Sequence, residues 1–412
     1  MRHGPDPRAL LDDLIGRRDE LIDLLRRLVV AESPSLDPHS HDRAGHVLEA
    51  ELGARDFRVR RLPGRTSSGQ VWARPERRMR GRPMQLLLGH LDTVWPVGTL
   101  AEMPFEVDGD IVRGPGVFDM KGGLAVMLLA LDALRRQGVE PPLTPVVFVN
   151  SDEEIGSHES QRRIRSLARR VRRTWVLEPS LGLAGRLKTA RKGVARFTVR
   201  VYGRAAHAGL EPEAGASAIL ELSHVIRSLF ALNDPERGIT VNVGTVDGGL
   251  GPNVVAPESR AVADVRVCGE ADAQQVEGAI RGLEAATPGT RLEIHGGFGR
   301  PPMERTPRNR RLWTLARAAA ARLDMELDEG LAGGGSDGST TSLYTATLDG
   351  LGAVGAGAHA PDECLFVGAT LQRAALLALL LAAPDVVDEL DEPGEADEAD
   401  AAASGDAARG AC

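Results

Sequence analysis

Hydrophobic positions repeat with different periods along this chain, and its first part combines helical spacing with short apolar runs. Residues 8–30 carry leucines three and four positions apart with charged residues between them, which predicts one amphipathic helix packed on a core. Uninterrupted apolar runs predict strands buried on both faces of a parallel sheet, with helices such as 121–136 between them. These runs are 85–89, 145–149, 174–177 and 351–358.

The middle of the chain has a different pattern. Residues 195–202 alternate apolar and polar side chains, as a strand with one buried face does. The following segments predict helix, strand, strand, helix and strand, which is the order of a ferredoxin-like split β-α-β-β-α-β unit. Their ranges are 214–231, 240–246, 259–268, 271–286 and 290–295.

A further amphipathic helix over 309–323 and the last apolar run follow this unit, so we expect a second domain to be inserted into the first. The predicted fold class is α/β, with a mostly parallel mixed sheet flanked by helices and an inserted α+β domain. The C-terminal residues are mainly Asp, Glu, Ala and Gly, which predicts a disordered acidic tail. The expected boundaries are 1–192 and 301–384 for the first domain, 193–300 for the inserted domain and 385–412 for the tail.

Composition argues against several classes of function. The 412 residues are 42% hydrophobic and 26% charged, as in a soluble globular protein. A formal net charge of −8 provides no general attraction to nucleic acid or to anionic lipid. The first residues lack the apolar core of a signal peptide, and no run of about 18 apolar residues occurs. We therefore expect a cytoplasmic protein with neither nucleic-acid nor membrane partners.

Histidines and carboxylates occur where the predicted strands end. In an open parallel sheet, ligands bind beyond the carboxyl ends of the strands. So many carboxylates on one rim would repel each other unless cations were bound. Histidine and carboxylate ligands without thiolate favour Zn2+, with Co2+ or Mn2+ as alternatives. The residues at or near these ends are His90, Asp92, Asp119, Glu153, Glu154, Glu178 and His359.

Each of these residues also has a structural interpretation. A single histidine is more often a surface or hydrogen-bonded core residue than a ligand, and adjacent glutamates are usually solvated. Their coincidence at several strand ends favours a metal site. Asp92 lies two residues after His90, on the same face if the strand continues, which predicts that Asp92 supports the ligands. The cysteines lack C-x-x-C spacing and are expected to be structural or incidental, namely Cys268, Cys364 and Cys412.

Four separated motifs resemble those of the M20 metallopeptidases, and among them the glutamate carboxypeptidases. They occur in the family's order, and the resemblance extends from about residue 10 to 385. It implies a zinc-exopeptidase-like catalytic domain with an inserted lid that also forms a homodimer. The motifs are HLDTV at 90–94, GPGVFDMKGG at 114–123, DEEIGS at 152–157 and AHAG at 206–209.

The resemblance also implies roles for the strand-end residues. Two Zn2+ ions would share Asp119, and Glu153 would be the general base. Two ions held about 3.5–4 Å apart lower the pKa of a bridging water towards neutrality, so the base need only accept its proton. The implied ligand pairs are His90 with Glu178 and His359 with Glu154, each completed by the shared Asp119.

Substrate contacts are implied from the inserted domain and from a glycine-rich turn. By the resemblance, His207 would hold the scissile carbonyl, commonly from the partner subunit. Asn253 and Arg300 would hold the carboxylate end of the substrate, since a planar guanidinium suits carboxylate binding. All three lie in or near turns, where a purely structural role is the alternative. The glycine-rich turn would line the substrate side with Gly334, Gly335 and Ser336.

These observations predict a di-zinc hydrolase that cleaves an amide next to a free carboxylate. It would release a C-terminal amino acid, for example glutamate, from a peptide, a folate-like conjugate or an N-acyl amino acid. Alternatives are a dedicated deacylase of the acetylornithine or succinyl-diaminopimelate type and a non-catalytic binding protein, although the complete ligand set disfavours the latter. The turn at 333–338 lacks the lysine of a nucleotide loop, so phosphate binding there is not expected.

Overall fold

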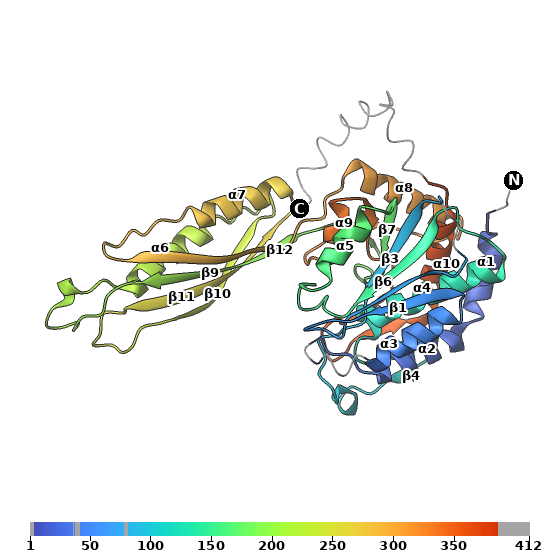
Figure 1. Cartoon of the computed structure of the whole chain (residues 1–412), viewed down its shortest axis with the longest axis horizontal. Coiled ribbons are helices and arrows are strands. Elements are labelled where there is room, and N and C mark those ends of the chain that lie inside the picture. The colour runs from blue at the N-terminus through green and yellow to red at the C-terminus, as the bar shows by residue number, and fades with distance from the viewer. Residues whose placement is uncertain (1–3, 36, 38–41, 78–80, 386–412) are drawn as a thin grey trace, which may run out of the picture. The chain divides into compact units, whose positions relative to one another are not determined.

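The computed structural model describes residues 4–35, 37, 42–77 and 81–385, which fall into two compact units (Figure 1). The second unit comprises Ala190–Glu304 and Gly333–Gly335, and the first comprises the other described residues. The inserted segment thus extends a few residues beyond 193–300 at each end, and it includes the glycine turn that we had placed in the first domain. The predicted acidic tail, apart from Asp385, lies outside the described residues.

A mostly parallel sheet forms the centre of the first unit. Its order is β1-β2-β6-β3-β7-β14, and of these described strands only β2 runs opposite to the rest. The two central strands are buried at all but their first residue, as strands between two helical layers are. The predicted α/β fold is confirmed. The strands are β1 (Phe57–Leu62), β2 (Gln70–Pro75), β3 (Met84–His90), β6 (Thr144–Asn150), β7 (Arg173–Val176) and β14 (Ala346–Leu348).

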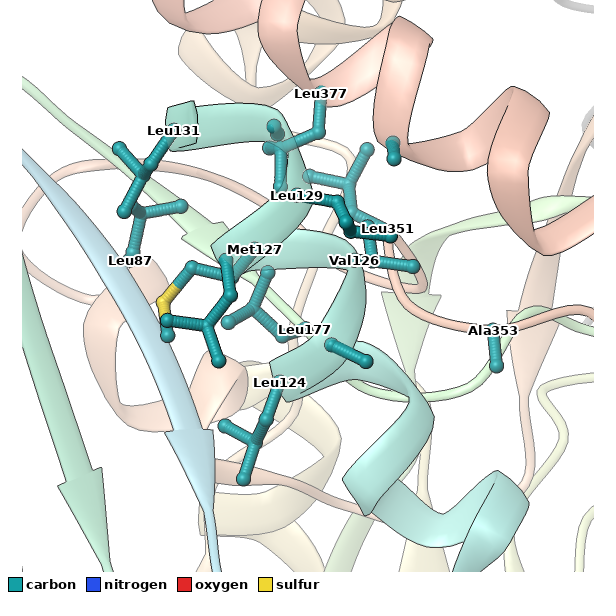
Figure 2. Close-up of a cluster of buried hydrophobic side chains, with 14 of the residues drawn as sticks. Leu87, Leu124, Val126, Met127, Leu129, Leu131, Leu177, Leu351, Ala353 and Leu377 are labelled. Atoms are coloured by element: carbon teal, nitrogen blue, oxygen red, sulfur yellow. The ribbon is translucent and has the colours of Figure 1, made fainter. Parts of the chain in front are cut away.

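Helices cover both faces of this sheet. Side chains alternate along a strand, so Leu87 of β3 enters the larger core and Leu86 enters the smaller one. The larger core contains leucines of α4 and α10 (Figure 2), and the smaller core receives Ile164 of α5. The helices are α1 (Pro7–Ile15), α2 (Arg18–Val30), α3 (Asp42–Gly53), α4 (Gly122–Arg136), α5 (Gln161–Ala168), α8 (Pro307–Ala321), α9 (Asp337–Ser342) and α10 (Val367–Ala382).

Two predictions for this unit are wrong in detail. The single helix over 8–30 is two helices, because the chain breaks at Gly16 and Arg17, whose guanidinium turns inward to Asp132. The run 351–358 is not a strand of the main sheet. Gly350 has a φ of +82° and directs the chain away after β14. The run is apolar because it packs beside the end of β7, where Leu351 N donates to Val176 O.

A smaller antiparallel sheet brings two distant segments together. Its order is β15-β16-β5-β4. Because β5 pairs with β16, the loop after β5 lies alongside the turn before β16, and these two segments carry Asp119 and His359. The strands are β4 (Glu106–Asp108), β5 (Ile111–Arg113), β15 (Gly355–Ala356) and β16 (Cys364–Phe366), and elsewhere β8 (Leu187–Arg191) pairs with β13 (Glu329–Ala332).

The second unit is an antiparallel sheet with both of its longer helices on one face (Figure 1). Its order, β10-β11-β9-β12, is that of a split β-α-β-β-α-β unit. Alternate residues of β9, including Phe197 and Val199, pack against the helices. No helix in the described chain is long and apolar enough to cross a membrane. The elements are β9 (Gly193–Tyr202), α6 (Ala218–Phe230), β10 (Thr240–Gly248), β11 (Glu258–Val267), α7 (Glu270–Arg281) and β12 (Arg291–Arg300).

Candidate metal centre

The strand-end residues come together at the carboxyl edge of the main sheet. His90 is the last residue of β3, and Glu154 and Glu178 lie in the segments that follow β6 and β7. Asp119 lies in a short π-helical turn, η2 (Val117–Lys121), that leads into α4. We had predicted that His359 ends a strand of this sheet, and this prediction is wrong. It lies in the turn between β15 and β16 with a φ of +62°.

The two histidines face opposite oxygens of one carboxylate. His90 Nε2 lies 3.4 Å from Asp119 Oδ1 and 3.5 Å from Glu178 Oε1. His359 Nε2 lies 3.3 Å from Asp119 Oδ2 and 3.1 Å from Glu154 Oε2. Each histidine therefore has its own second carboxylate, and Asp119 is common to both groups. This is the arrangement that a bridging carboxylate between two ions requires.

The electrostatics of the cluster call for positive charge. Burial raises the pKa of Asp119, but His359 and His90 hold it well below its usual range. Asp119 and Glu154 raise the pKa of His359 to about 10. Burial lowers the pKa of His90, yet hydrogen bonds to Asp119 and neighbouring carboxylates raise it well above its ordinary value. The imidazolium protons thus supply charge that divalent ions would supply instead.

Asp92 fixes the positions of both the histidine and the turn after β6. His90 Nδ1 donates to the carbonyl oxygen of Asp92 at 2.9 Å, which directs Nε2 at the carboxylates. The Asp92 carboxylate accepts from the backbone N of Glu153 at 3.2 Å, from that of Glu154 at 3.1 Å and from Ser35 Oγ at 2.7 Å. Because β3 ends at His90, the loop after the strand sets the position of Asp92. A continued strand face does not set it.

The turn that carries Glu153 and Glu154 is held from beneath by buried polar groups. Asp152 Oδ2 accepts from the backbone N of Ser160 at 3.1 Å. Asp337, at the start of α9, accepts from Asn150 Nδ2 at 2.7 Å and from Ser157 Oγ at 2.6 Å. One oxygen each of Glu153 and Glu178 and a ring nitrogen of His90 lie within 4.8 Å of one another. Glu153 is thus next to the cluster but in a different group from Glu154.

Sequence reasoning missed Glu363, which holds the loop of the shared carboxylate. Its side chain is fully buried and accepts hydrogen bonds from the backbone N of Gly116, Phe118 and Asp119 at 2.8–2.9 Å. Trp95 Nε1 is a fourth donor, at 2.9 Å. Three of these donors are backbone groups, which no sequence pattern identifies, and the only signal was an acidic residue four positions after His359.

The second unit carries two of the expected substrate residues side by side. His207 and Asn253 are exposed, and the N of Ala208 donates to the carbonyl oxygen of Asn253 at 3.0 Å. His207 Nδ1 accepts from the backbone N of Gly209 at 3.1 Å and of Leu210 at 3.2 Å. A neutral His207 therefore carries its proton on Nε2, so this nitrogen is a hydrogen-bond donor.

The other expected substrate residues are more enclosed. Arg300 ends β12, is 7% exposed and packs against Gly335, where an added Cβ would lie 2.7 Å from that of the arginine. Arg191 Nη1 donates to the carbonyl oxygen of Gly334 at 3.0 Å. Ser336 is fully buried and caps α9, with its hydroxyl donating to Asp349 at 2.7 Å. The structure thus gives Ser336 a capping role inside the first unit.

Residues 86–383 match the model of peptidase family M20/M25/M40. The chain belongs to this family. It is therefore a hydrolase of the metallopeptidase class, and the family resemblance noted in the sequence is confirmed. The M20 chain is 30% identical over 375 residues to carboxypeptidase G2 from Pseudomonas sp. (strain RS-16), and the match covers 88% of each protein.

Solved structures share the fold of this M20 chain at low sequence identity. The aminopeptidase PepT from Bacillus cereus superposes with a TM-score of 0.71 at 19% identity, covering 90% of this chain and 98% of that one. A dinuclear metal-binding peptidase of family M20 from Bacillus subtilis superposes with a TM-score of 0.63 at 17% identity, covering 91% of this chain and 98% of that one.

Proposed function

We propose that this M20 chain is a di-zinc hydrolase that cleaves an amide bond next to a free carboxylate and releases a C-terminal amino acid. One observation carries the proposal: Asp119 presents one oxygen to each of two histidines, each of which has its own second carboxylate. Three ligands around each of two ions leave coordination positions open for water and substrate. The proposed ligands are His90, Asp119, Glu154, Glu178 and His359.

In the proposed reaction the protein residues position groups and move protons. Two zinc ions, when bound, would activate a water and polarise the scissile carbonyl. Glu153 lies beside the two groups of side chains that share Asp119. It accepts the proton of that water and later donates it to the leaving amine. Asp92 holds His90 and the Glu153 turn in fixed relation, so base and ligands keep their geometry during the proton transfer.

The second unit would supply the substrate contacts. The Nε2–H of His207 is proposed to donate to the scissile carbonyl oxygen, either within one chain or from the partner subunit of a homodimer. Asn253 and Arg300 are proposed to bind the substrate carboxylate, with Gly334 and Gly335 beside it. Two backbone N–H groups donate to Nδ1 of His207. They support this assignment, because Nδ1 then accepts hydrogen bonds and Nε2 is the ring nitrogen that can donate.

The proposed substrates are peptides, folate-like conjugates or N-acyl amino acids with a free carboxylate. Similarity to carboxypeptidase G2 favours release of a C-terminal amino acid, and the resemblance to glutamate carboxypeptidases in the sequence motifs favours glutamate as that amino acid. A deacylase of the acetylornithine or succinyl-diaminopimelate type uses the same metal chemistry and differs in the pocket beyond the scissile bond. A panel of N-acyl amino acids that varies the acyl group and the amino acid separately distinguishes these two activities.

The proposal is tested by elemental analysis combined with one assay. We expect about two zinc equivalents per chain, with hydrolysis of a C-terminal glutamate amide that is lost on chelation and restored by Zn2+. Restoration by Co2+ or Mn2+ at a higher rate would change the metal but not the mechanism. Full metal occupancy without hydrolysis of any carboxylate-bearing amide would contradict the proposed function.

A further inference from the structure

Arg373 lies inside the first unit, where no described residue is a partner for its charge. The residue belongs to α10 and is 2% exposed. Within the described part of the chain its Nη1 atom has no hydrogen-bond acceptor, and no carboxylate forms an ion pair with it. Burial lowers the pKa of Arg373 to about 10. A guanidinium with such a pKa is still charged at neutral pH, and no described residue compensates this positive charge.

Another buried arginine of the same unit shows how the fold accommodates such a group. Arg173 of β7 is also buried. It donates to Gln85 Oε1 at 3.0 Å and to the carbonyl oxygens of Pro384 and Ala383 at 2.8 Å. An isolated charge in a protein interior is strongly unfavourable, and proteins normally pair it or surround it with hydrogen-bond acceptors. The contrast with Arg173 indicates that the partner of Arg373 is not part of the described chain.

The guanidinium of Arg373 packs against a glycine. A Cβ added to Gly185 would lie 2.8 Å from Arg373 Nη2 and 3.2 Å from a methyl group of Val354, so the guanidinium lies directly against this glycine. Ser180 Oγ is also buried without a partner in the described chain. Ser180 N donates to the carbonyl oxygen of Ala353 at 2.9 Å, so the Ser180 backbone lies next to the residue before Val354.

We propose that the Arg373 guanidinium binds a small monovalent inorganic anion of the halide class beside Gly185. An anion would accept hydrogen bonds from the guanidinium, as water could, and would also compensate its charge. A large organic anion is excluded because Arg373 and Gly185 are both buried. The ion would anchor the turn over 181–186, which begins three residues after Glu178. The site is separate from the proposed zinc ligands and does not depend on the proposed function.

Thermal unfolding of the metal-loaded protein tests the site. Chloride is exchanged for gluconate, an anion too large for the site, at constant ionic strength. We expect the wild-type Tm to rise by about 3 °C or more between chloride-free buffer and 300 mM chloride. Arg373→Met should abolish this chloride dependence, and in chloride-free buffer it should be at least as stable as wild type, because methionine fills similar volume without the charge.

Arg173→Met is the matched control. This variant removes a buried arginine that is already hydrogen-bonded, so it should lower Tm equally in chloride and in gluconate. Equal wild-type Tm values in the two salts, or chloride dependence that persists in Arg373→Met, would overturn the proposal. If Arg373→Met does not fold, crystals of the wild-type protein grown in bromide decide the question. An anomalous peak beside the guanidinium supports the site, and a water without anomalous signal there refutes it.

Discussion

At the scale of single residues, two adjacent glutamates have different surroundings. Glu154 Oε2 lies 3.1 Å from His359 Nε2, whereas Glu153 shares its group with His90 and Glu178. Their backbone N–H groups both donate to Asp92, so one carboxylate fixes the two main-chain positions. We propose that Glu154 binds an ion and that Glu153 accepts a proton.

Glu153→Gln should separate these two roles. The amide cannot accept a proton, so kcat should fall by about 10²- to 10⁴-fold while bound zinc remains near two equivalents. Glu154→Gln is the comparison, because it should lower zinc content as well as activity. Metal analysis and steady-state kinetics on both variants measure the difference. A Glu153→Gln enzyme with near wild-type kcat would show that another group is the base.

Glu363→Gln should weaken metal binding without removing any ligand. The two carboxylate oxygens of Glu363 accept four hydrogen bonds. The amide of glutamine has only one acceptor oxygen, and its NH2 group would face donors. We expect zinc affinity, measured by competition with a chelator, to fall about 10- to 100-fold. Asp362→Asn is the control, since Asp362 is exposed. Unchanged zinc affinity in Glu363→Gln would assign Glu363 a role in stability alone.

At the scale of secondary structure elements, α4 connects the shared carboxylate to the sheet. Its first residues follow Asp119, and its leucines form much of the larger core with β3 and α10 (Figure 2). The helix approaches the end of β7 so closely that a Cβ at Gly123 would lie 1.9 Å from Leu177 O. The glycine therefore sets the distance between the Asp119 turn and the segment of Glu178.

Gly123→Ala should destabilise the protein and disturb the metal centre together. The added methyl group meets backbone and not a movable side chain, so we expect a loss of at least about 2 kcal/mol in urea unfolding, with reduced zinc content. Gly278→Ala in α7 is the matched control, because no atom lies within 4 Å of its added Cβ. That change should stabilise by about 0.5–1 kcal/mol through helix propensity. Equal stabilities for the two variants would contradict the close approach.

At the scale of the whole molecule, stability depends on the charge at the metal centre. In the metal-free protein the pKa of His359 is raised to about 10 and that of His90 lies well above its ordinary value. A histidine whose pKa is higher in the folded state contributes stability fully below its unfolded pKa of about 6.5, and loses it as pH rises through the folded pKa. The depressed pKa of Asp119 contributes stability that is lost only at acidic pH.

Metal removal should therefore make stability strongly pH-dependent. We expect the Tm of chelated protein to fall steadily between about pH 6.5 and pH 10. Zinc-loaded protein should change less over this range, because the ions replace the histidine protons. Calorimetry of both forms across the pH series measures the two slopes. Parallel slopes would show that the histidines do not carry the charge of the metal-free cluster.

The sequence by itself determined the fold class, several central elements and the identity of the candidate ligands. Apolar runs at 85–89 and 145–149 predicted β3 and β6, and in a parallel sheet the residues after such strands meet at one edge. The alternation in 195–202 likewise predicted the half-buried strand β9. These inferences succeed because burial on one or both faces sets a local hydrophobic period.

Only the tertiary structure decided how the ligands are oriented and held. The run 351–358 looked like a strand, yet it is apolar because it packs beside β7. Glu363 acts through backbone N–H groups of a loop about 245 residues away in sequence, and such groups are the same for every residue type. Arg373 stands out only in the folded structure, because none of the described residues around it carries a counter-charge. Hydrophobic period is a local property of the chain, whereas hydrogen-bond partners and charge compensation depend on which distant segments fold together.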